Sequence, residues 1–99
     1  MPGRSRTELN DATRLYELGY KISGTSREKR WEVLTTKAIP QLGLWSVVHT
    51  IANHCQLRKL QHNGREKYSF AIGEWEYDLE RIKKKYSPTD FYAWPSTEP

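Results

Sequence analysis

The chain has a single cysteine, Cys55, so one copy of it cannot form an internal disulfide. Small secreted scaffolds usually depend on several disulfides, and this absence argues against that class. The sequence also lacks any stretch near the ~20 apolar residues that a membrane-spanning helix requires. No apolar segment of the kind that a secretory signal needs follows the basic N-terminus. We therefore expect a cytoplasmic protein that makes no contact with membranes.

Ligands for a metal ion are scarce in the sequence. The candidates are His49, His54, Cys55 and His62, whereas zinc needs three or four ligands around one point. On a shared helix, Cys55 and His62 would stand ~10 Å apart along the axis, and His54 would point to another side. A lone cysteine on an apolar stripe is usually a buried small hydrophobe. We expect no metal and no cofactor.

The residue arrangements that support catalysis are also missing. Cys55 falls on an expected apolar helix stripe, where burial makes a thiol inert. The carboxylates Glu74, Asp78 and Glu80 lie among basic residues on one expected helix, a pattern typical of a solvated face. The glycines stand singly and form no phosphate-binding loop. We expect no enzymatic activity and no small-molecule substrate.

Aromatic and charged residues are plentiful by comparison. The 99 residues suit one domain, and they include four Trp, six Tyr and two Phe among a hydrophobic share of 36%. Large aromatic side chains are an efficient way to build the core of so short a chain. The formal net charge of +4 permits binding to nucleic acid without requiring it.

Hydrophobic periodicity and turn residues predict an all-α fold, a compact bundle-like domain of about four helices with an irregular C-terminal tail. The first helix covers residues 7–18. The second begins at a capping box formed by Thr25 and Glu28 and kinks or ends before Pro40. The third and fourth cover residues 44–62 and 65–86. We expect a flexible N-terminus over 1–6, a helical domain over 7–86 and a Pro- and aromatic-rich tail over 87–99.

Each expected helix has one apolar side that we assign to the core. On the fourth helix the apolar residues follow one another at intervals of four, three, four, three and four, with Trp75 in the middle. The expected core residues are Leu9, Ala12, Leu15 and Tyr16, then Trp31, Leu34, Ala38 and Leu42, then Leu44, Val48, Ile51, Ala52 and Cys55, and finally Tyr68, Ile72, Trp75, Leu79, Ile82 and Tyr86.

The third helix indicates a nucleic-acid contact. Its residues 44–57 include no charged side chain, yet its sides outside the core stripe are polar. Neutral amides and hydroxyls match the hydrogen-bonding edges of bases, and Asn or Gln pairs well with adenine. The candidate base-contacting residues are His49, Thr50, Asn53 and Gln56. The alternative is that this helix is neutral because it is buried in the centre of the domain.

Basic residues follow at the end of the third helix and in the next turn. Arg58, Lys59, Arg65 and Lys67 stand against Glu66 alone, which leaves a local excess of positive charge suited to phosphates. The segment around Gly43 also resembles a helix-turn-helix, although the later apolar spacing is one residue short. The leading hypothesis is a small non-catalytic domain that binds nucleic acid through residues 44–62 and the basic turn.

The fourth helix suggests a second kind of function. Phe70 and Tyr77 fall on the side opposite the core stripe, and Gly73 between them opens a shallow patch. Exposed apolar patches usually serve a partner, so the alternative hypothesis is a protein-interaction or dimerisation module that uses this patch. A competing explanation is that the tail aromatics, Phe91, Tyr92 and Trp94, cover it within the same chain.

Overall fold

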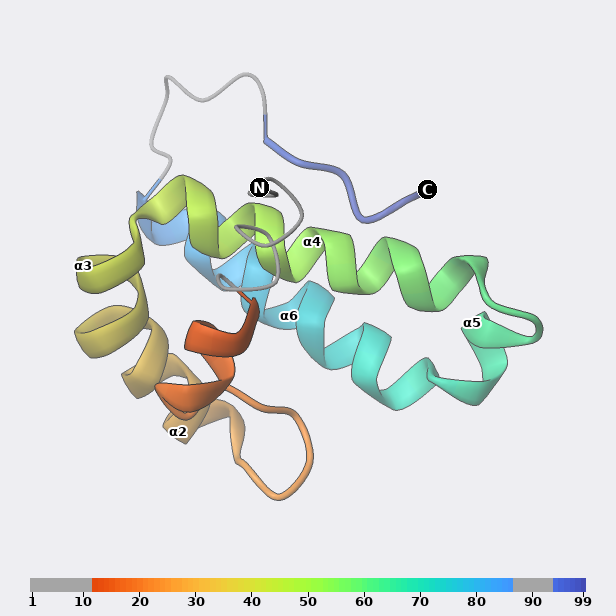
Figure 1. Cartoon of the computed structure of the whole chain (residues 1–99), viewed down its shortest axis with the longest axis horizontal. Coiled ribbons are helices and arrows are strands. Elements are labelled where there is room, and N and C mark those ends of the chain that lie inside the picture. The colour runs from red at the N-terminus through yellow and green to blue at the C-terminus, as the bar shows by residue number, and fades with distance from the viewer. Residues whose placement is uncertain (1–11, 87–93) are drawn as a thin grey trace, which may run out of the picture. The chain divides into compact units, whose positions relative to one another are not determined.

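The computed structural model describes residues 12–86 and 94–99, and it confirms an all-α fold (Figure 1). Within those ranges all regular structure is helical and no strand is present. Residues 12–17 are helical, and they are followed by α2 (Arg27–Val33), the π-helix η1 (Leu34–Ala38), α3 (Ile39–Leu42), α4 (Leu44–Leu60), α5 (Gly64–Lys67) and α6 (Ser69–Tyr86). Leu9, Phe91, Tyr92 and the predicted flexible residues 1–6 lie outside the described residues.

The chain divides into two units, Met1–Thr50 and Ile51–Pro99, and the boundary falls within α4. In unit 1 the first helical segment ends at Gly19, whose φ of +111° is a conformation that glycine adopts without strain. Leu15 and Tyr20 are buried there, but Tyr16 is 62% exposed, so its assignment to the core is wrong. The buried side of this segment is centred on Leu15, and Tyr16 is turned toward solvent with Lys21 near its ring.

The second helix begins one residue later than the predicted capping box implies. Ser26 is the N-cap, and its hydroxyl accepts a hydrogen bond of 3.1 Å from the backbone N–H of Lys29. The Thr25 hydroxyl instead donates to the Ser23 carbonyl. Ser26 accepts a hydrogen bond from an unpaired N–H of the first helical turn, which is the role that the sequence assigned to Thr25. A side-chain hydroxyl therefore caps this helix one residue after the predicted position.

Pro40 widens its helix and does not end it. The turn before it is the π-helix η1, in which the N–H of Ile39 donates to the carbonyl of Leu34. A proline inside an α-helix has no N–H to donate and clashes with the carbonyl four residues earlier. The hydroxyls of Thr35 and Thr36 donate to carbonyls of the preceding turn at 2.9 and 2.6 Å, which compensates part of the missing backbone bonding. The helix then continues as α3 to Gly43.

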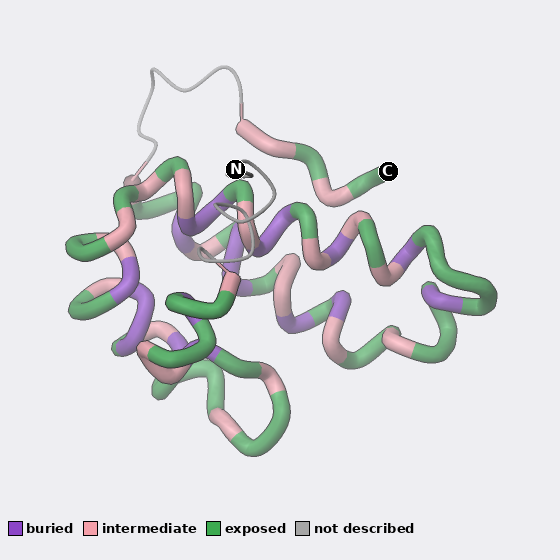
Figure 2. The backbone as a smooth tube through the Cα atoms, in the orientation of Figure 1, coloured by how far each residue is buried: buried purple, intermediate pink, exposed green. Residues whose placement is uncertain are grey.

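In unit 2, the end of α4 and the first part of α6 lie side by side and antiparallel, joined through α5 (Figure 1). The buried residues recur along one side of each helix, as the purple segments of Figure 2 show. Cys55 is fully buried against α6, with its Sγ 3.9 Å from the carbonyl oxygen of Ile72. The buried apolar residues of this unit are Ile51, Ala52, Cys55, Ile72, Leu79 and Ile82.

Three residues of α6 differ from the sequence-based assignment. Trp75 is half-buried and stacks on the His54 ring with centroids 5.6 Å apart, so it is not the central core residue that the sequence predicted, whereas Ile82 on the same helix is fully buried. Asp78 is fully buried and Glu74 is 8% exposed, so the prediction of a solvated acidic face is wrong at both positions. Buried carboxylates require polar partners. These two side chains are therefore part of the packed interior and do not form a surface charge pattern.

The predicted helix 65–86 is split at Tyr68, and Gly64 explains its start. Asn63 adopts a left-handed conformation with φ 58°, and α5 begins at the next residue. A Cβ on Gly64 would overlap the backbone carbonyl of Arg58, so only glycine fits at this close approach of α5 to the end of α4.

The two glycines of unit 2 should respond oppositely to alanine. Gly64→Ala should lower the free energy of unfolding by ~1–3 kcal/mol, because backbone atoms must move to admit the new methyl group. Gly73→Ala should raise it by up to ~1 kcal/mol, because a Cβ there meets nothing within 4 Å and alanine favours the helix. Urea unfolding of both variants measures the two effects. Equal changes of the same sign would show that the close approach at Gly64 does not exist.

Candidate functional site

The eight residues predicted to contact nucleic acid fall in both units. His49 and Thr50 belong to unit 1, where His49 is exposed and its ring lies 5.2 Å from that of Trp45. The other six belong to unit 2. Asn53, Arg65 and Lys67 are exposed, Gln56 and Arg58 are half-buried, and Lys59 is buried.

Two of the basic residues meet at one aromatic ring. The Arg58 guanidinium lies 5.3 Å from the centroid of the Tyr68 ring, and the Lys67 ammonium lies 5.5 Å from it. Tyr68 is the residue between α5 and α6 whose backbone departs from the helix, with φ −110°. Cations within ~6 Å of a ring are attracted by its negative face, so the break in the helix holds both charges close together.

The other two basic residues hold one carboxylate between them. Lys59 Nζ lies 2.8 Å from one carboxylate oxygen of Glu98, and Arg65 Nη2 lies 2.8 Å from the other. We call the pair Lys59 and Arg65 the anion site. The two cations hold the pKa of Glu98 down, from 4.5 to about 2, chiefly through their hydrogen bonds. The geometry is that of a site for an anion with two accessible oxygens.

Lys59 is more deeply placed than a solvent-facing phosphate contact requires. Its side chain is 3% exposed, and its ammonium also donates to Glu76 at 2.8 Å and to the Thr97 hydroxyl at 3.5 Å. Burial lowers the pKa of Lys59, but the hydrogen bonds to Glu76 and Glu98 outweigh this and the pKa is raised overall. Lys59 therefore keeps its charge and has a permanent partner on α6.

The tail residues 94–99 lie extended along α4 and complete the site. The Gln56 side-chain amide donates to the backbone carbonyl of Ser96 at 2.6 Å, and the Thr97 hydroxyl donates to Glu76 at 2.9 Å. The tail residues that touch the site were not identified from the sequence. Because 40 positions separate Gln56 from Ser96, no local pattern joins them.

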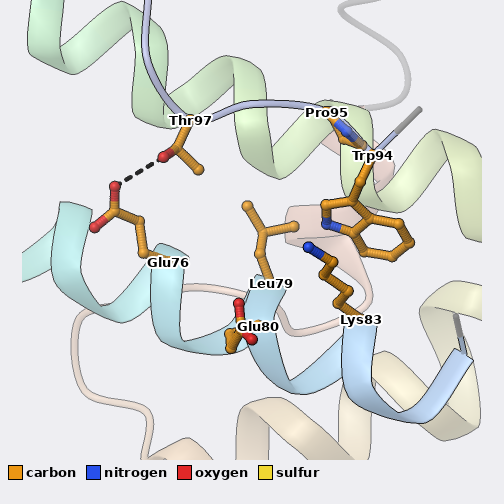
Figure 3. Close-up of a pocket in the computed structure, with 7 residues that line it drawn as sticks. All are labelled: Glu76, Leu79, Glu80, Lys83, Trp94, Pro95 and Thr97. Carbon is orange, nitrogen blue, oxygen red and sulfur yellow. Dashed lines mark hydrogen bonds between the residues drawn. The ribbon is translucent and has the colours of Figure 1, made fainter. Parts of the chain in front are cut away.

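A cavity of about 200 Å³ lies between the tail and α6 (Figure 3). Leu79 forms its base, and the side chain of Lys83 extends toward the Trp94 indole (Figure 3). The residues that line it are Glu76, Leu79, Glu80, Lys83, Trp94, Pro95 and Thr97. Trp94 and Pro95 thus pack on α6, while the acidic end of the tail reaches the anion site.

Phe70 is the more exposed of the two aromatic residues in the predicted partner patch on α6. Phe70 is 68% exposed and Tyr77 is 38% exposed, and a Cβ built on Gly73 between them meets nothing within 4 Å. Neither aromatic residue lines the cavity beside Trp94. The described part of the tail therefore binds beside this patch and leaves Phe70 exposed.

Metal ligands and membrane-spanning segments are not found in the part of the chain that the structure describes. No three His, Cys, Asp or Glu side chains among those residues are grouped so that they could hold a metal ion. No helix within residues 12–86 and 94–99 has the length and apolar character needed to span a membrane.

Cys55 should resist thiol reagents in the folded protein. Burial, followed by the nearby carboxylate of Glu76, raises the pKa of its thiol to about 12, so almost no thiolate is present near neutral pH. The native protein should react with a disulfide reagent far more slowly than the same protein in denaturant. Absorbance of the released thiol follows both rates. Equal rates would contradict the burial of Cys55.

Acid should release the tail from the anion site. The pKa of Glu98 is depressed to about 2 in the docked state, so the docking energy is present above the ordinary carboxyl pKa and disappears as the pH falls toward 2. We expect the indole signal of Trp94 in a nuclear magnetic resonance spectrum to move between about pH 4.5 and 2. Glu98→Gln, which has no carboxyl group to titrate at this position, should remove that transition. A transition that persists in the variant would assign it to another group.

No family model, curated protein or solved structure matches this chain.

Proposed function

We propose that this chain is a small non-catalytic domain that binds nucleic acid through the end of α4, the turn that follows it and α5. The observation that supports the proposal is the anion site, where Lys59 and Arg65 each hold one oxygen of the same carboxylate at 2.8 Å. A phosphodiester group offers the same features, two acceptor oxygens and one negative charge.

The surroundings of the anion site add to its suitability for a polyanion. Arg58 and Lys67 are held at the Tyr68 ring in the same unit, so two further cations accompany the pair Lys59 and Arg65. Only Glu66 opposes them within the basic turn itself. Contacts of this kind depend on charge and not on base sequence, so they supply affinity for any nucleic acid.

Asn53 is the residue best placed to add sequence preference. It is exposed on α4 and carries a neutral amide, which matches the donor and acceptor pattern of a base edge. The Gln56 amide faces the tail and donates to Ser96, so it becomes available to a base only when the tail moves.

Binding to random duplex DNA, single-stranded DNA and RNA at ~50 mM salt tests the proposal, because backbone contacts are strong there. We expect measurable affinity that falls as salt is raised. Asn53→Ala should leave the salt dependence unchanged and reduce any sequence preference by ~1–3 kcal/mol. The absence of binding to every nucleic acid at that salt concentration would rule the proposal out.

A second candidate function, self-association or binding to a protein, is favoured by the open patch on α6. Phe70 is 68% exposed. Gly73 has no side chain, so another molecule can approach the backbone of α6 closely there. Apolar patches of this kind usually serve a partner. If a second copy binds there, the sedimentation coefficient of the wild type should rise with concentration, and Phe70→Glu should abolish the rise. A sedimentation coefficient independent of concentration would leave nucleic-acid binding as the single proposal.

A further inference from the structure

We propose that the tail, residues 94–99, is a displaceable cap on the anion site, and that Glu98 competes within the same chain with a nucleic-acid phosphate. This inference rests on the proposed function, since it names how that same site is regulated. Three observations support the cap: the side chains that bond to the tail, the exposure of the ion pair between Glu98 and Arg65, and the carboxylate of Glu76 that stays beside Lys59.

The tail engages the same side chains that we assign to nucleic acid. Gln56, Lys59 and Arg65 each bond to it, the first through Ser96 and the other two through Glu98. Asn53, Arg58 and Lys67 are the remaining assigned residues of unit 2, and no bond between them and the tail is observed within the described residues. With the tail in place, nucleic acid can therefore use Asn53, Arg58 and Lys67 only. Release of the tail would free Gln56, Lys59 and Arg65 for the same ligand.

One of the two ion pairs that hold the acidic end of the tail, the pair between Arg65 and Glu98, is of a weak kind. Glu98 and Arg65 have side chains that are each 61% exposed, and exposed ion pairs are screened by salt and contribute little. A nucleic acid offers many phosphates along one strand and gains from the release of its counterions. A polyanion can therefore displace a single carboxylate that is held in this way.

Departure of the tail does not leave Lys59 without a partner. The ammonium remains 2.8 Å from Glu76 on α6 when Glu98 is gone. A buried charge deprived of its last partner would oppose uncapping strongly, but here one carboxylate stays in place. A phosphate can therefore replace the Glu98 carboxylate at the anion site while Lys59 stays paired with Glu76.

In the capped state Trp94 and Pro95 line the cavity on α6 with Leu79 and Lys83 (Figure 3). When residues 94–99 leave, the chain still joins them to the end of α6 at Tyr86, which keeps the cap close to the site. A competitor that is tethered in this way reduces the apparent association constant for an external ligand to the intrinsic value multiplied by the fraction of molecules that are uncapped. The expected regulation is therefore a change in affinity.

The test compares charge changes at Glu98 with the same changes at Glu66. Glu66 is exposed on α5 and stands next to Arg65 in the sequence, so Glu66→Gln alters the net charge equally without altering a bond to the tail. Glu98→Gln should bind random duplex DNA between about three- and thirtyfold more tightly than Glu66→Gln, since the variant removes both ion pairs that hold the cap. Glu98→Lys against Glu66→Lys should widen the difference, because a cation at the cap is repelled by the anion site.

A spectroscopic measurement follows the cap itself. The indole resonance of Trp94 in isotope-labelled full-length protein is assigned with Trp94→Phe. Addition of duplex DNA to the wild type should move this resonance to its position in Glu98→Lys, because both conditions release the tail.

The outcomes separate the two proposals. If the wild type binds DNA, the Glu98 variants match their Glu66 controls and the Trp94 resonance stays in place, the cap is refuted and the proposed function stands. If neither the wild type nor Glu98→Lys binds any nucleic acid, the proposed function is refuted and the cap with it. A gain restricted to the Glu98 variants together with a moving Trp94 resonance supports both.

Discussion

Replacing Ile82 with alanine should lower the free energy of unfolding by ~2–5 kcal/mol. Ile82 is fully buried on α6, so the change removes apolar atoms from the core and leaves a cavity that the neighbouring helices fill only in part. A decrease of this size is a large share of the stability of a small domain. Thermal and urea unfolding of the variant measure it.

The matched control for Ile82 lies on the same helix. Phe70→Ala removes more side-chain atoms, but Phe70 is 68% exposed, and surface changes usually alter stability by less than ~0.5 kcal/mol. If Phe70→Ala proved as destabilising as Ile82→Ala in the isolated chain, the buried and exposed sides of α6 would have been assigned the wrong way round.

Changing Arg58, Arg65 and Lys67 together to glutamine should weaken the binding of every duplex sequence and flatten its salt dependence. The slope of log K against log salt should fall by ~0.9 for each phosphate that the variant no longer neutralises. Lys59 is left unchanged in this variant, because its side chain is only 3% exposed and is paired with Glu76. Removing a buried partner could destabilise the fold and confuse the two effects.

The control for this prediction removes three positive charges elsewhere on the chain. Lys37 on η1 and Lys84 and Lys85 in the last turn of α6 are exposed, and their replacement by glutamine changes the net charge by the same amount. Affinity measured between ~50 and ~200 mM salt should keep its slope in this control. A slope that falls equally in both variants would mean that net charge, and not the basic turn, determines the affinity.

The helical character of the fold could be predicted from periodicity and turn residues. On α6, the recurring apolar positions identify Ile72, Leu79 and Ile82 as buried, and they are. The break at Tyr68 could not be predicted, because no local pattern in residues 65–86 marks it. The close approach of Gly64 to the Arg58 carbonyl could not be predicted either, because it joins two segments that meet only in the folded chain.

Charged residues were harder to place than apolar ones. Asp78 has acidic and basic neighbours that are typical of a solvated face, yet it is fully buried. The four basic residues of the turn were identified from their composition, but their division into a pair at Tyr68 and a pair at Glu98 was not. Apart from Lys67 and Tyr68, the partners are distant in sequence, and no local pattern in the sequence indicates which of them meet.

The raised pKa of Lys59 and the lowered pKa of Glu98 have a consequence for the heat of binding. Glu98 titrates near 2 and Lys59 above its ordinary range, so both groups keep their charge throughout the neutral region. Replacing the Glu98 carboxylate with a phosphate at the anion site then requires neither to take up or release a proton. Calorimetric enthalpies of binding measured in buffers of different ionisation enthalpy should therefore coincide.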